Sequence, residues 1–232
     1  MKKLIALVLA LVLALAAASA LAAEEAEGAA VMTYEEYAAA EKDDEVTLAT
    51  YVQATQSWWD GKITVYAQSP EGPCFIYEMA CSEEDAAKLV PGTPIIVHGF
   101  KGEWGGEIEI MNATFEFGEG DPYIAEAADV TELIGTEELI NCMNAKVAFK
   151  GLTLDGPITY KDDKVGEDDI YFTASKDGKA VNFCVEIYLT GADTEVYKAV
   201  QALQPGDVID VEAFLYWYEG ANPHVIGVTK AE

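Results

Sequence analysis

An internal repeat constrains the fold of this chain more than any other feature. The segment LVPGTPIIV at 89–97 reappears as LQPGDVIDV at 203–211, which places Pro91 and Pro205 114 residues apart. A period of this length is too long for one unit of a solenoid and suits a duplicated domain. We therefore expect two domains of the same fold, one after the other along the chain.

The segments around the two Pro-Gly pairs repeat as well. An apolar strand and a helix precede each pair, and two strands joined by a turn follow it. Ser82 with Asp85 resembles a capping pair, and Asp193 is expected to cap the second helix. The predicted elements lie at 74–79, 82–89, 95–103 and 107–117 in the first copy, and at 181–188, 194–203, 208–218 and 224–229 in the second.

Two further strands and a short helix are predicted upstream of these elements in each copy. Asp60-Gly61 between two alternating runs is a strong signal for a two-residue hairpin. Thr33 and Glu36 have the spacing of a capping box at the start of the first helix, which runs to about residue 42. The strands are expected at 46–59, 62–68, 145–154 and 169–175, the second helix at 136–144, and a polar loop at 155–168.

Each copy thus reads as a helix followed by β-β-β-α-β-β, which predicts a mainly β protein with short helices. Five strands with a helix between the third and fourth is the order of the OB-fold barrel. The repeated Leu-x-Pro-Gly-x-x-Ile-x-Val segment resembles the entry into the fourth strand of OB-fold domains. From about 31 to 230 the chain also resembles exported bacterial proteins with tandem OB-like domains and no assigned function. A sandwich or another small barrel is the alternative. We expect OB-like domain 1 at 33–117, a linker at 118–128 and OB-like domain 2 at 129–232.

The first 22 residues have the pattern of a secretory signal peptide. Lys2 and Lys3 precede an apolar run at 4–18, and the small residues Ala20 and Ala22 follow it. The run is shorter than the roughly 20 residues that span a bilayer, so a retained anchor is the weaker alternative. We expect a disordered lead at 23–32 and a secreted, periplasmic or cell-envelope protein with no stable membrane insertion after cleavage.

The charge of the chain is strongly negative. Its net charge is −27, which becomes −29 when Lys2 and Lys3 are removed with the signal, and it contains no arginine. Such a field repels phosphate backbones, and arginine is the preferred residue for recognising phosphates and bases. Nucleic acid is therefore not expected as a partner. Export permits disulfides, so paired cysteines and buried free thiols both stay open for Cys74, Cys81, Cys142 and Cys184.

Aromatic residues gather where OB-folds bind their ligands. Those sites are the face of strands two and three and the loops that join strands 1–2 and 4–5. Because neighbouring strand residues point to opposite faces, one of Trp58 and Trp59 should face the barrel interior. The alternative is that the rings cover barrel ends or the contact between barrels. The predicted ligand-binding residues are Trp58, Trp59 and Trp104 in the first copy, and Tyr216, Trp217, Tyr218 and His224 in the second.

No catalytic residue, cofactor or metal site is predicted. His98 and His224 are isolated from one another and from close cysteine or carboxylate ligands, and no nucleophile-elbow pattern is present. Carboxylate pairs of the kind that hydrolyse glycosides arise by chance among 41 acidic residues. The acidic loop at 162–169 lacks the spacing of an EF-hand, which leaves only weak calcium binding open there.

We therefore expect an exported, non-enzymatic binding or interaction protein that recognises carbohydrate or the surface of an envelope protein through its loop aromatics. The alternative is a structural or accessory cell-envelope protein with no small-molecule ligand. Burial of the tryptophans between the two barrels would favour that alternative. An enzyme is the third hypothesis, and it would require a cleft in which a few polar groups converge.

Overall fold

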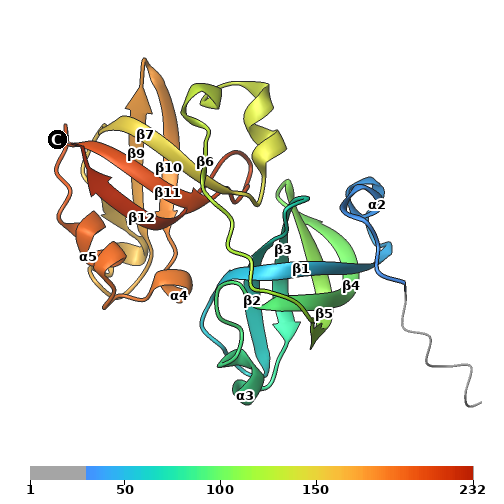
Figure 1. Ribbon diagram of the computed structural model, residues 1–232. Helices are drawn as coiled ribbons and strands as arrows, with labels where there is room; N and C mark the ends of the chain where they lie inside the picture. The colour runs from blue at the N-terminus through green and yellow to red at the C-terminus, as the bar shows by residue number, and fades with distance from the viewer. Residues whose placement is uncertain (1–29, 232) are drawn as a thin grey trace, which may run out of the picture. The chain divides into compact units, whose positions relative to one another are not determined.

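The first copy of the repeat closes into a β-barrel (Figure 1). The computed structural model describes residues 30–231 of the chain. Around the first barrel the strand order is β1-β2-β3-β5-β4, and β4 pairs with β1 to close it. This is the strand order of an OB-fold. Its strands are β1 (Glu45–Thr55), β2 (Lys62–Gln68), β3 (Pro73–Ala80), β4 (Pro94–Trp104) and β5 (Glu107–Phe117).

The second copy closes in the same order, which confirms the prediction of two tandem five-stranded OB-like barrels. Its order is β7-β9-β10-β12-β11, and pairing of β11 with β7 closes the ring. The short strands β6 (Ala128–Asp129) and β8 (Thr159–Tyr160) extend it at its edges. The barrel strands are β7 (Lys146–Leu154), β9 (Ile170–Lys176), β10 (Lys179–Val185), β11 (Val208–Phe214) and β12 (His224–Lys230).

The repeated Pro-Gly pair has the same structural task in both barrels. Gly92 and Gly206 have φ angles of 93° and 92°, a region that suits glycine because it has no Cβ. The Gly92 N–H donates to the carbonyl of Val52 at 2.7 Å, and the Gly206 N–H donates to that of Leu154 at 2.8 Å. In each copy the turn therefore ties the entry of the fourth strand to the first strand, which explains why this segment repeats.

The helices are short and only partly as expected. The capping box of Thr33 and Glu36 forms at the start of α2 (Tyr34–Ala39), and Ser82 caps α3 (Glu83–Ala86). In the second copy Thr194, rather than Asp193, caps α5 (Glu195–Gln201), because its hydroxyl accepts the N–H of Tyr197. The helix expected at 136–144 is a 3-10 helix, η2 (Glu137–Cys142), and two more 3-10 turns are η1 (Thr131–Leu133) and η3 (Lys161–Asp163).

Several predicted boundaries were wrong. The strand expected at 181–188 ends at Val185 and gives way to the helix α4 (Ile187–Thr190). Glu186 causes this change, because its carboxylate accepts the N–H groups of the first turn of α4. The strands expected to reach residues 59 and 218 end at 55 and 214. Disorder was expected up to residue 32, but Met32 is ordered, because its N–H donates to the carbonyl of Thr47 at 2.8 Å.

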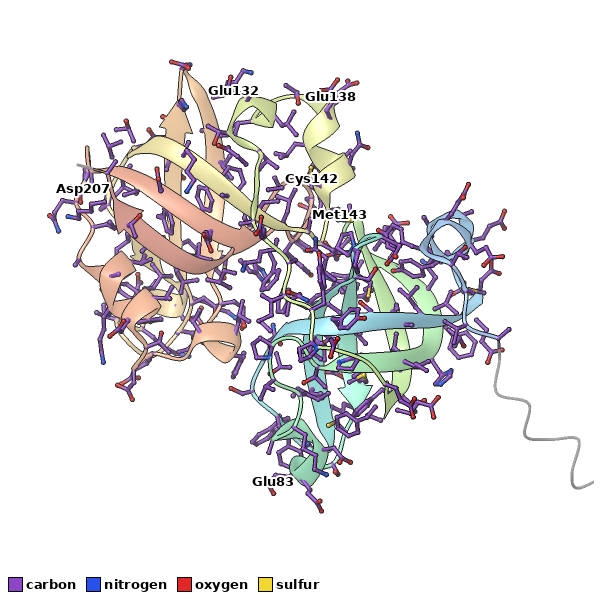
Figure 2. All side chains as sticks on the ribbon, in the orientation of Figure 1. Glu83, Glu132, Glu138, Cys142, Met143 and Asp207 are labelled. Carbon is purple, nitrogen blue, oxygen red and sulfur yellow. The ribbon has the colours of Figure 1, made fainter. Side chains whose placement is uncertain are left out.

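Each barrel encloses its own apolar core, and the side chains drawn on the ribbon extend into both barrels (Figure 2). Equivalent positions of the repeat, Ile95 and Val97 in the first copy and Ile209 and Val211 in the second, are all buried. A third cluster joins the barrels within the single compact unit that runs from Met32 onward. It contains Tyr66 and Phe75 from the first barrel and Phe214 from the second, with the Tyr66 and Phe214 rings stacked 4.7 Å apart.

The structure leaves the N-terminal predictions untouched. The predicted signal peptide at 1–22 and most of the lead at 23–32 lie outside the described residues. Within residues 30–231, no helix is both long and apolar enough to cross a membrane. All four cysteines lie in this range and carry free thiols, so the alternative of unpaired cysteines holds.

Candidate binding groove

A groove of about 630 Å³ opens beside the β1–β2 hairpin of the first barrel. One wall is the hairpin itself, from Gln56 to Thr64, and another is formed by Tyr77 and Glu78 of β3. The last wall is Tyr188 of α4, which belongs to the second barrel. The groove thus lies on the strand two and three face of an OB barrel, where this fold places its ligands.

The hairpin holds its two tryptophans in different environments. Asp60 and Gly61 both have positive φ, as a two-residue type I′ turn requires, and Trp59 pairs with Lys62 across the turn. The indole N–H of Trp58 donates to the carbonyl of Cys81 at 2.8 Å, and its ring packs on the first core. The side chain of Trp59 is 80% exposed. The expected division into one inward and one outward ring is confirmed.

The charged groups of the groove largely satisfy one another. The Lys62 ammonium lies 2.7 Å from a carboxylate oxygen of Glu78, and both side chains are about half exposed. This hydrogen bond lowers the pKa of Glu78 and raises that of Lys62. Asp60 adds a further carboxylate to the lining. A ligand therefore meets rings flanked by a paired lysine and one more acidic group.

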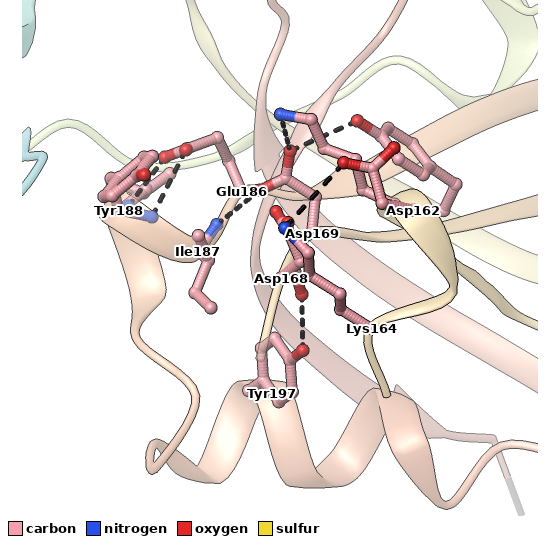
Figure 3. Close-up of polar contacts among 11 residues, drawn as sticks. Asp162, Lys164, Asp168, Asp169, Glu186, Ile187, Tyr188 and Tyr197 are labelled. Atoms are coloured by element: carbon pink, nitrogen blue, oxygen red, sulfur yellow. Dashed lines mark hydrogen bonds and ion pairs between the residues drawn. The ribbon is translucent and has the colours of Figure 1, made fainter. Parts of the chain in front are cut away.

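A polar network in the second barrel holds the segment that carries Tyr188 (Figure 3). The two carboxylate oxygens of Glu186 accept the N–H groups of Tyr188 and Leu189 at 3.2 and 2.7 Å. A carboxylate oxygen of Asp169 accepts the N–H of Ile187 at 2.9 Å. The Asp169 side chain is itself almost fully buried and lies 3.5 Å from the ammonium of Lys161.

The other predicted binding residues of the loops lie outside the groove lining. Trp104 is 63% exposed at the β4–β5 turn of the first barrel. A Cβ built on Gly105 would lie 2.6 Å from the Tyr218 ring, and one on Gly106 would lie 3.1 Å from Trp217. The Glu219 N–H also donates to the Gly105 carbonyl at 2.7 Å. The structure thus brings Trp217 and Tyr218 against this turn.

Tyr216 and His224 meet at the contact between the barrels. Their rings stack with centroids 4.4 Å apart, and Nδ1 of His224 lies 2.6 Å from the hydroxyl of Tyr66. Burial lowers the pKa of His224 to about 3, so the imidazole is neutral at physiological pH. This geometry fits the alternative that the rings cover the contact between the barrels. A ligand role for Tyr216 and His224 stays a prediction.

Glu107 is a buried carboxyl group at the same contact. One of its oxygens accepts the N–H of Trp217 at 2.7 Å, while the other has no hydrogen-bond partner among the described residues. Burial raises the pKa of Glu107 to about 8, so the group carries a proton over most of the physiological range. Within residues 30–231, no cluster of three or more His, Cys, Asp or Glu side chains is arranged to hold a metal ion.

Two aromatic residues of the groove were missed in the sequence. Tyr77 lies on β3 and points outward, and strand alternation next to the buried Ile76 could have identified it. Tyr188 carries no such signal, because it reaches the groove only through the contact between the barrels. The sequence predicted Tyr188 at the end of a strand, whereas it lies on the helix α4.

Comparison with known proteins gives distant structural likeness only. No protein-family model and no curated protein matches the sequence. A murine DNA-binding protein bound to double-stranded DNA is 12% identical, with a TM-score of 0.38, over 80% of this chain and 96% of that one. The p204 HINb domain is 12% identical (TM-score 0.36; 83% and 100% covered). A single-stranded DNA-binding protein from Thermus aquaticus is 12% identical (TM-score 0.26; 82% and 96% covered). Likeness this distant assigns no role to any residue of this chain.

These findings correct the predicted function. The predicted carbohydrate or envelope-protein ligand and the exclusion of nucleic acid are corrected here, because two of these matched proteins are described as binding double-stranded or single-stranded DNA. Burial of the tryptophans between the barrels, which would have favoured the accessory envelope alternative, is not found for Trp59 and Trp104, because both are exposed. The exclusion of nucleic acid relied on net charge and on the absence of arginine. Net charge sets the field at a distance, whereas stacking a base on a ring needs no contact with phosphate.

Proposed function

We propose that the groove of the first barrel binds bases of single-stranded nucleic acid by stacking. The observation that carries this proposal is the largely exposed ring of Trp59 in a groove also lined by Trp58, Tyr77 and Tyr188. Aromatic rings in such grooves stack bases and contribute about 1–3 kcal/mol per base, with little dependence on sequence. The groove also lies on the face through which OB-folds take oligonucleotides.

The charge of the protein determines what kind of binding this is. With a net charge of −27 and Lys62 paired to Glu78, phosphates find little attraction at the groove. Proteins that hold phosphates with lysine and arginine release counterions and lose affinity steeply as salt rises. Here we expect affinity to stay level or to increase with salt, because added ions screen the repulsion of the backbone.

Fluorescence anisotropy with a labelled oligothymidylate tests the proposal. We expect the oligothymidylate to bind and an abasic oligomer of the same length to bind far more weakly, because only the former offers bases to stack. Trp59→Ala should weaken binding by roughly 5- to 150-fold, the equivalent of one lost stacking contact. Equal binding of the two oligomers, or an affinity that falls steeply with salt, would contradict base stacking.

Trp104→Ala is the matched control. It removes the same side chain from an exposed position outside the groove lining. We expect it to leave the affinity for oligothymidylate within about twofold of the parent protein, which lies within the ±0.5 kcal/mol typical of neutral surface changes. A loss as large as that of Trp59→Ala would move the site to the β4–β5 turn.

The proposal includes export and the absence of catalysis. Export and kinship with exported bacterial OB-fold proteins rest on the signal-like residues 1–22 and the repeat. The intact mass of the protein recovered from its host should correspond to a chain that begins at Ala23. A chain that keeps Met1 would remove export from the proposal. Binding without catalysis is part of the proposal, because the groove offers exposed rings and a lysine that is already paired with Glu78.

A further inference from the structure

The second barrel supplies one wall of the groove through a very short helix. Tyr188 lies on α4 and is 63% exposed, with its ring lining the groove. Its carbonyl accepts both the N–H of Ser57 at 2.7 Å and the hydroxyl of Ser57 at 3.2 Å. The position of α4 therefore sets the distance between the Tyr188 ring and the hairpin that carries Trp59.

Carboxylates, rather than helical propensity, hold α4 in place. A helix of four residues cannot stabilise itself, since nucleation costs more than so few bonds return. Three consecutive backbone N–H groups, those of residues 187–189, each donate to a carboxylate oxygen. Asp169 accepts the first and Glu186 accepts the other two, while Leu189 packs on the aromatic cluster between the barrels. The orientation of Tyr188 thus depends on these two acids (Figure 3).

We infer that Glu186 is a positioning residue of the groove, whose carboxylate fixes α4 and thereby sets Tyr188 as the wall contributed by the second barrel. This deepens the proposed function and rests on it only for the identity of the ligand. The prediction that follows is that the groove is a composite site. A substitution that removes the Glu186 carboxylate should make Tyr188 more mobile, although every residue of the first barrel keeps its identity.

The surroundings of Glu186 oppose its charge on balance. Burial raises its pKa to about 7, the backbone N–H groups that it accepts lower the pKa, the charge of Asp169 just before β9 raises it, and Lys161 of η3 lowers it. Cys184 of β10 and the buried Tyr66 of the first barrel also face it. The folded state therefore holds the proton more tightly than the unfolded chain, so the contribution of this group to stability falls as pH rises from about 4.5 to about 7. At pH 8 the group is mostly ionised, and both of its oxygens are free to accept N–H groups.

Hydrogen exchange of the intact protein tests the clamp without any ligand. At pH 8 we expect Glu186→Gln to speed exchange of the amides of Ser57, Tyr188 and Leu189 by roughly two- to thirtyfold, the factor that corresponds to a lost helix cap. The Gln side chain has nearly the same shape, so the barrel should stay folded. Glu195→Gln, an exposed change in the first turn of α5, is the matched control and should leave these amides unchanged. Unchanged exchange in Glu186→Gln would overturn the inference.

Anisotropy with the labelled oligothymidylate then links the clamp to binding. At pH 8 we expect Glu186→Gln to bind more weakly than the parent protein, because the amide offers one acceptor oxygen where the carboxylate offers two. Tyr188→Ala should weaken binding by about fivefold or more, while Tyr188→Phe, which keeps the ring, should not. If the parent protein binds no oligonucleotide, the proposed function fails and the exchange experiment still decides the role of Glu186. If the parent protein and Glu186→Gln bind the oligothymidylate equally at pH 8, the role of Glu186 fails alone.

Discussion

The two barrels share a strand order but differ in the connection between their first two strands. In the first barrel that connection is the turn at Asp60-Gly61, which presents Trp59 to solvent. In the second it is a long segment that contains β8 and η3. The equivalent face there has a smaller hollow of about 340 Å³, lined by Tyr171 and Phe172 rather than by tryptophans. The duplicated frame is thus retained in both copies, while only the first copy carries the larger groove and the exposed tryptophan of its hairpin.

The largest expected effect tests whether equivalent positions of the repeat contribute equally to the cores of the two barrels. Ile95→Ala and Ile209→Ala remove the same buried side chain from equivalent positions of the two copies. Each should lower the free energy of unfolding by about 2–5 kcal/mol, because a cavity remains in a closed core. Urea unfolding measures both. A large loss in one copy and almost none in the other would break the equivalence of the two barrels.

Two buried groups, Glu107 and His224, should change stability with pH in opposite directions. Glu107 and His224 each begin the fifth strand of a barrel, and both are buried. The pKa of Glu107 rises from 4.5 to about 8, so the folded state keeps a proton that the unfolded chain loses, and stability falls as pH rises through this window. The pKa of His224 falls from 6.5 to about 3, so the unfolded chain takes up the proton first, and stability falls as pH drops from 6.5.

Each group alone contributes a slope of up to about 1.4 kcal/mol per pH unit. In thermal or urea unfolding followed across pH, Glu107→Gln should remove the loss of stability that accompanies a rise from about pH 4.5 to 8, and His224→Gln should remove the loss that accompanies a fall below about pH 6.5. Slopes rather than absolute stabilities are the readout, because the His224 change also removes the contact with the Tyr66 hydroxyl. Variants whose slopes match those of the parent protein would show that neither group is buried in its neutral form.

The smallest expected effect concerns the glycine of the Pro-Gly turn, which has the same conformation in both barrels but different neighbours. Gly92 and Gly206 have nearly the same positive φ, but an added Cβ meets Pro122 at 3.0 Å in the first case and nothing within 4 Å in the second. Gly206→Ala should cost about 1–2 kcal/mol from backbone strain alone. Gly92→Ala should cost more by a few tenths of a kcal/mol, since Pro122 must move. Equal costs in thermal unfolding would mean that the chain after β5 does not pack on the first turn.

Sequence reasoning predicted the features that local chemistry determines. The Pro-Gly repeat, the capping box at Thr33 and the Asp60-Gly61 turn each depend on a few neighbouring residues, and each forms as expected. The groove could be predicted only in part. Trp58 and Trp59 follow from the hairpin, whereas Tyr188 depends on a short helix that Glu186 and Asp169 hold and on the packing of one barrel against the other. These tertiary contacts leave no periodic pattern in the sequence.

The nucleic-acid prediction failed at a different level. Counting charges over the whole chain treated every surface alike, although Lys62 and Glu78 neutralise each other in the groove. The aromatic residues of the first barrel were recognised, but the charge count removed the ligand class that such rings stack best. Local pairing of charges, which only the structure reveals, decides how much of the net charge a ligand meets.

The indole N–H signals of the four tryptophans give the most direct test of binding at the groove. In nitrogen-15 NMR spectra of the intact protein, Trp58, Trp59, Trp104 and Trp217 each contribute one such signal. With saturating oligothymidylate we predict that the signals of Trp58 and Trp59 shift, while those of Trp104 and Trp217 stay in place. Shifts confined to Trp104 and Trp217, or no shift at all, would contradict base stacking in the groove of the first barrel.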